Sequence, residues 1–161
     1  MQITPAGAED WPRIWPIFAA VVEDGETYAY PWPLSPTDAQ AIWLEPPPGH
    51  AVVAVDGDEV LGTAKMGPNR PGRGAHVATA SFMVASSAQG RGVGRALAGY
   101  MVGWAGEQGF RAIQFNAVVE TNVAAVHLWQ ALGFHIVGTV PEAFDSRTHG
   151  LVGLHVMHRY L

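Results

Sequence analysis

A chain of 161 residues, of which 48% are hydrophobic and 14% charged, suits one domain that can bury a substantial core. Its net charge of −5 argues against a nucleic-acid backbone as the main partner, and no uninterrupted apolar run reaches the ~18 residues of a membrane span. The absence of cysteine excludes disulfides, a thiolate metal site and a cysteine nucleophile, and without a recognisable signal peptide we expect a cytoplasmic protein.

The first third of the chain predicts a strand, two helices and an aromatic loop. Residues 2–4 fit a short strand, and apolar residues recur at helical spacing over 9–22, although Pro16 should kink or restart that helix. Residues 25–36 are rich in proline, tyrosine and tryptophan and fit an ordered loop. A Ser-Pro pair then opens a short predicted helix over 35–44, with serine as the N-cap and proline at N1.

The middle of the chain predicts a hairpin, then a strand, a helix and another strand. Segments 50–55 and 59–66 flank an Asp-Gly-Asp sequence, which we interpret as a three-residue hairpin turn. After a loop rich in proline, glycine and arginine, an apolar run over 75–84 predicts a strand. Apolar residues on one helical face predict a helix from about Arg91 to a C-cap at Gly109, and 112–118 fits the next strand.

The last part of the chain predicts a helix and two strands. The helix spans 122–133, with asparagine as its N-cap and glycine at its end, and the strands cover 134–140 and 151–160 around a loop. No internal repeat, linker or low-complexity segment is visible, so we expect one domain over residues 1–161. Its fold class is α/β (α+β), with a mixed sheet of about six to seven strands and about four helices.

The most informative segment is a glycine-rich turn at 89–95, between a predicted strand and a predicted helix. Its three glycines remove the Cβ atoms that would keep a phosphate away from the backbone. The first N–H groups of a helix have no internal partner, and the helix dipole, Arg91 and Arg95 add positive charge. The turn predicts a phosphate or pyrophosphate site; the alternative is a plain left-handed cap before the helix.

Two common phosphate-binding motifs do not fit this turn. The loop of nucleotide triphosphatases requires Gly-Lys-Ser/Thr, and the only lysine of the chain is Lys65. The dinucleotide fingerprint requires a third glycine where Arg95 or Leu97 stands, and no acidic residue ends the following strand near Asn116. The pattern that does fit is Gln-x-x-Gly-x-Gly, which begins at Gln89.

This turn resembles the acyl-coenzyme A binding turn of the GCN5-related N-acetyltransferases (GNAT). A second family pattern, Asn-x-x-Ala-x-x-Leu-Trp/Tyr-x-x-x-Gly-Phe, is present as Asn122, Ala125, Leu128, Trp129, Gly133 and Phe134. The predicted order of strands and helices also matches the family over nearly the whole chain. The resemblance implies a single GNAT-type domain that uses acetyl-CoA as cosubstrate and no metal.

The resemblance also implies which residues hold the cofactor. Backbone amides of the turn would bind the pyrophosphate, with Gln89 bracing the turn, and the preceding strand would pair with the pantetheine arm through its backbone. An amide near Val84 would polarise the thioester carbonyl. Trp129 stands where many members carry a tyrosine that serves as general acid, so we interpret it as a core or cofactor-packing residue. The predicted cofactor-binding residues are Phe82, Met83, Val84, Gln89, Gly90, Arg91, Gly92, Val93, Gly94, Arg95, Asn122 and Trp129.

The groups that handle the amine and its proton stay open at this stage. No carboxylate lies on the strand 75–84, where many relatives carry a glutamate, so the catalytic candidates are Thr79, Asn116 and Glu120. Glu120 could be the base or only a helix-start acid. Asn116 either satisfies backbone groups or points into the substrate site. A tyrosine of the aromatic loop or water could protonate the thiolate, and the predicted substrate residues are Tyr28, Tyr30, Thr79, Ser81 and Asn116.

A narrower pattern around the second motif is similar to acetyltransferases of proline-like imino acids such as azetidine-2-carboxylate. It comprises Phe115, Asn116, Val118, Thr121, Asn122, Ala124, Leu128, Trp129 and Leu132. Those enzymes carry a third asparagine where Thr79 stands here, which leaves phosphinothricin-type acetyltransferases as a related possibility. We therefore expect a small amine with a carboxylate as the substrate.

Charge and resemblance together limit the partners. Residues 1–60 hold ten acidic residues and one basic residue, whereas 61–161 hold eight basic and four acidic residues. This split suits an anionic cofactor and a cationic amine; the alternative is solvated faces whose charges happen to segregate. We expect a small-molecule partner and neither nucleic acid nor membrane, with a homodimer through the terminal strands as an arrangement that such domains adopt. The alternatives are acetylation of a protein or peptide and a non-catalytic acyl-CoA-binding sensor.

Overall fold

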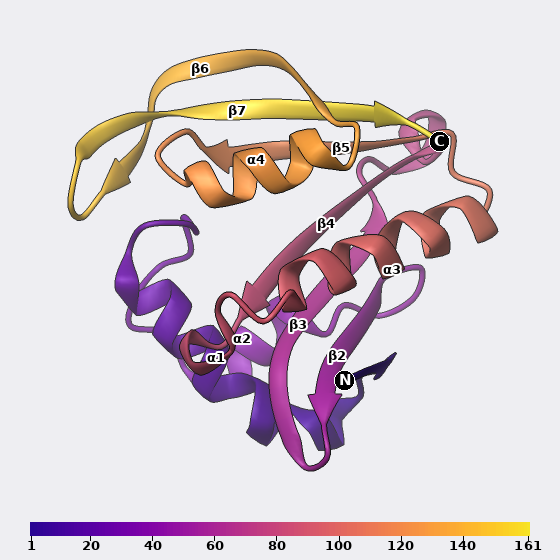
Figure 1. Ribbon diagram of the computed structural model, residues 1–161, viewed down its shortest axis with the longest axis vertical. Coiled ribbons are helices and arrows are strands. Elements are labelled where there is room, and N and C mark those ends of the chain that lie inside the picture. Colours follow the sequence, from indigo (N-terminus) through magenta and orange to yellow (C-terminus); the bar gives the residue numbers. More distant parts are fainter.

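The computed structural model describes all 161 residues and forms one seven-stranded mixed sheet flanked by four α-helices (Figure 1). The strand order is β1-β2-β3-β4-β5-β7-β6. The strands are β1 (Gln2–Pro5), β2 (His50–Asp56), β3 (Glu59–Pro68), β4 (Val77–Val84), β5 (Ala112–Val119), β6 (His135–Ser146) and β7 (Gly150–Tyr160). The helices are α1 (Trp11–Asp24), α2 (Pro36–Trp43), α3 (Val93–Glu107) and α4 (Val123–Ala131). The fold class, sheet size and helix number predicted from the sequence are confirmed.

Strands β1 to β4 form an antiparallel half of the sheet with helices on both faces. Side chains alternate between the two faces of a strand, so neighbouring residues enter different cores. Val52 and Ala54 pack in the cluster that contains α3, whereas Val53 packs in the cluster that contains α1 and α2. Both faces of this half are therefore buried, which explains why its strands are nearly continuous apolar runs.

The two halves of the sheet meet along β4 and β5, the one parallel pair. Their ladder has only two partner positions, Val77 with Ala112 and Ala78 with Ile113, after which the strands diverge. β5 continues against β7, and its pairing is interrupted by a register shift between Phe115 and Val118. Figure 1 shows β4 running away from β5 towards the beginning of α3. This divergence opens the sheet at its centre.

Both helix caps predicted from the sequence are present. The Ser35 hydroxyl accepts from the N–H of Asp38 at 3.1 Å, and the Asn122 side chain accepts from the N–H of Ala125 at 3.2 Å. Of the two outcomes predicted at Pro16, the restart is wrong, because α1 continues through this residue. Burial of the apolar face of α1, which includes the fully buried Phe18, outweighs the lost intrahelical hydrogen bond.

Other predicted boundaries differ from the structure for local reasons. Asp56 pairs directly with Glu59, so the first hairpin has a two-residue turn, and a bulge next to Ala54 adjusts its register. α3 begins at Val93 rather than near Arg91 because the glycine turn precedes it. β6 does not end at 140 but continues to Ser146, since a register shift between Val140 and Phe144 lets it pass Pro141 and remain paired with β7.

Candidate active site

A cavity of about 1080 Å³ lies where β4 and β5 diverge. Its walls come from β4, β5, the beginning of α3, α4 and the loop that joins α1 to α2. Of its 36 lining residues 21 are hydrophobic, so the polar groups among them are candidates for contacts with a ligand. The turn, the strand edge and the aromatic loop singled out in the sequence, which are far apart along the chain, all contribute to this one cavity.

The glycine turn forms one end of the cavity. The backbone N–H groups of Gly90, Gly92, Val93, Gly94 and Arg95 make no hydrogen bond within the protein. Gly90 and Gly92 have φ angles of 76° and 78°, and a Cβ on either would meet nothing within 4 Å. Five free donors at a helix N-terminus, beside open space, form a cradle that suits a pyrophosphate.

The two arginines of the turn have different surroundings. Arg95 lines the cavity, as do Gln89 and the glycines of the turn. Arg91 is absent from the lining, and its guanidinium donates to Asp56 of the β2–β3 hairpin at 3.2 Å. The positive charge predicted for the turn therefore faces the cavity through Arg95, and Arg91 is partly neutralised.

The edge of β4 that faces β5 carries backbone groups that do not pair with β3. The hydroxyl of Tyr28 donates to the carbonyl of Phe82 at 2.7 Å and accepts from the N–H of Phe82 at 2.9 Å. Phe82 therefore directs both backbone groups away from β3, and by the alternation of an antiparallel ladder Ala80 and Val84 do the same. Side chains along this strand also alternate, since Phe82 packs on the α3 side and Met83 on the α1 side.

Burial controls the ionisation of the tyrosines in the cavity. Burial raises the pKa of Tyr28 well above that of an ordinary tyrosine, although its hydrogen bonding to Phe82 acts in the opposite direction. The Tyr30 ring stacks on the Tyr28 ring with centroids 5.5 Å apart, and burial raises its pKa as well. Both hydroxyls are therefore neutral hydrogen-bonding groups at physiological pH.

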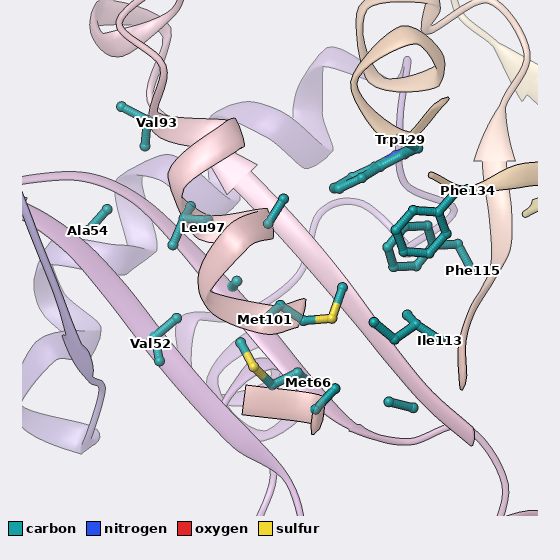
Figure 2. Close-up of a cluster of buried hydrophobic side chains, with 14 of the residues drawn as sticks. Val52, Ala54, Met66, Val93, Leu97, Met101, Ile113, Phe115, Trp129 and Phe134 are labelled. Carbon is teal, nitrogen blue, oxygen red and sulfur yellow. The ribbon is translucent and has the colours of Figure 1, made fainter. Parts of the chain in front are cut away.

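Helix α4 closes the β5 side of the cavity. Asn122 and Trp129 line the cavity, and the Trp129 ring is buried beside Phe82, Phe115 and Phe134, with centroids 4.9, 4.6 and 6.0 Å away. Figure 2 shows Trp129 next to the stacked rings of Phe115 and Phe134. The interpretation of Trp129 as a core residue is confirmed.

Asn116 lies at the register shift of β5 and lines the cavity. Its side-chain amide donates to Asn69 Oδ1 at 2.6 Å, and its Oδ1 accepts from Gln114 at 2.8 Å. The side chain is exposed rather than buried, and neither of these partners is a backbone group. The sequence did not single out Asn69, because a polar residue in a loop is unremarkable until the fold brings it to Asn116.

The remaining catalytic candidates lie at different distances from this arrangement. Thr79 and Ser81 both line the cavity from the same face of β4. Glu120 does not line it, because its carboxylate accepts from the N–H of Gly153 on β7. The predicted role of Glu120 as base gains no support from this position.

Three further charged residues that the sequence did not single out line the cavity, namely Asp24, Glu45 and Lys65. Lys65 of β3 and Glu45, just after α2, form an ion pair of 2.6 Å. The signal in the sequence was a single lysine within an apolar strand. No group of three or more histidine and carboxylate side chains lies close enough to hold a metal ion, and no helix has the length and apolarity needed to cross a membrane.

Comparison with known proteins identifies the class of protein that carries this cavity. Residues 14–134 match the model of the acetyltransferase (GNAT) family, and the chain therefore belongs to this family of acetyltransferases.

Individual relatives agree with this assignment. A GCN5-related N-acetyltransferase from Kribbella flavida is 61% identical with a TM-score of 0.96, over 99% of this chain and 97% of that one. The ribosomal-protein-alanine N-acetyltransferase from Brucella melitensis is 26% identical with a TM-score of 0.89, over the full length of both chains. N-acetyltransferase aca1 of Schizosaccharomyces pombe is 33% identical over 105 residues, 65% of this chain and only 50% of that protein.

Proposed function

We propose that this protein transfers an acetyl group from acetyl-CoA directly to a small amine, in particular one that resembles an amino or imino acid. The observation that carries the proposal is the cavity between β4 and β5. It joins the free amides of the glycine turn, the free edge of β4 and a polar end of hydroxyl and amide groups.

The residues of the cavity fit acetyl-CoA in three places. The free N–H groups of Gly90 and of residues 92–95, together with the Arg95 side chain, suit the pyrophosphate, whereas the Arg91 N–H donates to the Ala88 carbonyl. The edge of β4 at Val84 suits an extended amide-containing arm that pairs as another strand would, whereas the Tyr28 hydroxyl holds both backbone groups of Phe82. Asn122 and Trp129 line the opposite wall. Acetyl-CoA supplies the acyl group already activated as a thioester.

The polar end of the cavity suits an acceptor amine. Thr79, Ser81 and Asn116 offer hydroxyl and amide groups that orient the amine or a water that receives its proton. The Val84 N–H points to the same side as that of Phe82 and would stabilise negative charge on the acyl oxygen. The protein itself contributes these hydrogen-bond donors and holds the amine close to the thioester.

Tyr28 is the side chain best placed to help the sulfur depart. Its hydroxyl lies on the β4 edge at Phe82, and its raised pKa keeps it protonated. A phenol with a pKa above its ordinary value is a poor donor of a whole proton to a thiolate. We therefore assign to Tyr28 a hydrogen bond to the developing negative charge, made when its single hydroxyl hydrogen turns from the Phe82 carbonyl to the sulfur.

A protein N-terminus is the second candidate acceptor. The full-length similarity to the enzyme named ribosomal-protein-alanine N-acetyltransferase supports it. Against it stands the loop over residues 25–35, whose tyrosines cover the polar end of the cavity and whose Glu26 is hydrogen-bonded to the β6–β7 turn. A fixed loop favours a small acceptor over an extended peptide.

Thiol release from acetyl-CoA tests the proposal directly. The purified protein is supplied with a panel of amino acids, imino acids, aminoglycosides and N-terminal peptides. We expect release that depends on a small amine with a carboxylate. Release with peptides alone would support the second candidate, and tight coenzyme binding without release for any amine would mean a binding module instead of an enzyme acting on these amines.

A further inference from the structure

Lys65 is the only lysine of the chain and lies within an apolar strand at the wall of the cavity. Its side chain is 17% exposed. The ammonium donates to the carbonyl of Ile42 at 2.8 Å and to Glu45 Oε1 at 2.6 Å, which uses two of its three N–H groups. Removing an ammonium from water costs free energy. We therefore expect Lys65 to have a role at the cavity in addition to holding α2 against the sheet.

Two hydroxyl groups lie next to this ammonium. Ser81 is the register partner of Lys65 across the β3–β4 ladder. Tyr30 lines the same cavity as Lys65 and Ser81. Burial raises the pKa of Tyr30, and the nearby Lys65 charge acts in the opposite direction. An ammonium and two hydroxyls that converge on one wall are donors suited to a carboxylate.

The place of the ammonium and the two hydroxyls relative to β4 suits an amino acid that is bound by its carboxylate. Ser81 immediately precedes Phe82, whose backbone groups mark the edge of β4 that faces the acyl donor. The carboxylate and amine of an α-amino or imino acid are separated by a single carbon atom. A carboxylate held beside Ser81 and Lys65 would therefore leave the amine near the β4 edge.

We propose that Lys65, together with the hydroxyls of Tyr30 and Ser81, binds the carboxylate of an amino- or imino-acid acceptor. This inference rests on the proposed function and names the group that selects the substrate. Glu45 has a side chain 52% exposed and is the partner that a substrate carboxylate displaces in part.

The test compares acids with their neutral amides. Azetidine-2-carboxylate and phosphinothricin are each paired with the corresponding carboxamide, and kcat/KM is measured by thiol release. Calorimetry in the presence of coenzyme A measures the binding of the same four probes without chemistry. We expect the wild-type chain to prefer at least one acid over its amide in both measurements.

Two substitutions of the same ion pair should have opposite effects. Lys65→Met removes a charge-assisted hydrogen bond and should lower the ratio of kcat/KM for acid over amide by roughly 10- to 100-fold. Glu45→Gln frees the ammonium from its competitor and should leave the KM for the acid unchanged or lower it. A purely structural ion pair would instead lower the thermal stability in both variants and leave the acid-to-amide ratio unchanged. Arg73→Met, on an exposed loop outside the cavity, is the control for loss of a positive charge.

Each failure has its own signature. Equal turnover or binding of acids and amides by the wild-type chain overturns the assignment of Lys65 while the acetyltransferase function stands. Absence of thiol release with every probe contradicts the proposed function, and the calorimetric preference then decides the assignment of Lys65 on its own. If Lys65→Met does not fold, an increased KM for the acid in Glu45→Gln would overturn the inference.

Discussion

The hydroxyl of Tyr28 engages both backbone groups of Phe82 and is thereby fixed on the free edge of β4. The indole of Trp129, which occupies the sequence position of a tyrosine in many relatives, is packed among aromatic rings on the other side of Phe82. In the mechanism that we propose, the hydroxyl for the reacting sulfur therefore comes from the loop after α1 and not from α4.

Tyr28→Phe should reduce kcat by roughly 10- to 100-fold, because one hydrogen bond to a developing charge is lost. The pH dependence of kcat should keep its shape, since the raised pKa places the ionisation of Tyr28 outside the working range. Tyr30→Phe is the matched control and should act mainly on the KM of a carboxylate acceptor. Loss of the alkaline limb of the pH profile in Tyr28→Phe alone would show that Tyr28 transfers a whole proton.

The glycine turn allows a second test at a single residue. Gly92 has a φ of 78° and open space where a Cβ would lie, so the cost of any L-residue there is about 1 kcal/mol of backbone strain. Gly92→Ala introduces this strain alone, whereas Gly92→Glu also places a negative charge beside the free amides. We expect coenzyme A affinity, measured by calorimetry, to fall at least ~100-fold more in Gly92→Glu than in Gly92→Ala. Equal affinities would remove the turn from the cofactor site.

At the scale of elements, the aromatic loop is held against the opposite half of the sheet. Glu26 Oε2 accepts from the Ser146 hydroxyl at 2.6 Å, and Oε1 accepts from the Thr148 N–H at 2.8 Å and from its hydroxyl at 2.6 Å. The N–H of Arg147 also donates to the Gly25 carbonyl at 3.2 Å. The β6–β7 turn therefore holds the loop that carries Tyr28 and Tyr30 over the cavity.

The stability that these hydrogen bonds of Glu26 provide should depend on pH. Hydrogen bonds from Ser146 and Thr148 lower the pKa of Glu26, so the folded state favours the carboxylate more than the unfolded state does. The stabilisation is complete above the ordinary pKa of glutamate and is lost as the pH falls through the lowered value. Thermal denaturation should show a lower Tm for Glu26→Gln than for the wild type at neutral pH, with the difference vanishing in acid. Glu23→Gln, on the exposed side of α1, should show no such difference at any pH.

At the scale of the whole molecule, the diverging halves of the sheet are joined by aromatic packing. Trp129 and Phe134 come from the α4 segment, Phe115 from β5 and Phe82 from β4. These rings lie where strand-to-strand hydrogen bonds between β4 and β5 are absent. Some of these rings also line the cavity, so they belong both to the hydrophobic core and to the candidate site.

Trp129→Ala should destabilise the protein by about 3 to 5 kcal/mol, because a large buried ring is removed and the surrounding rings cannot fill its space. Trp129→Phe keeps most of the packing and should cost less, and it should retain acetyl transfer if Trp129 is no proton donor. Chemical denaturation gives the free energies and thiol release gives the activity. Complete inactivity of a stably folded Trp129→Phe would reassign the indole to catalysis.

Much of the fold could be predicted from the sequence because its signals are local. Apolar periodicity, the Ser35 and Asn122 caps and the glycine turn each depend on neighbouring residues, and all are present in the structure. The boundaries failed where pairing with a distant strand decides the outcome. β6 passes Pro141 only because β7 remains its partner, and α1 passes Pro16 only because its buried face holds it on the sheet.

The sequence alone determined the family resemblance and the glycine turn that we propose for the cofactor, since a run of glycines before a helix has the same chemistry in any surroundings. The acceptor end depends instead on residues from loops and strands far apart in the chain. Tyr28 meets Phe82, Asn116 meets Asn69, and Lys65 meets Glu45 only after the sheet has formed. A hydrogen bond requires two partners within about 3 Å, and for residues that distant in sequence only the tertiary structure supplies that distance.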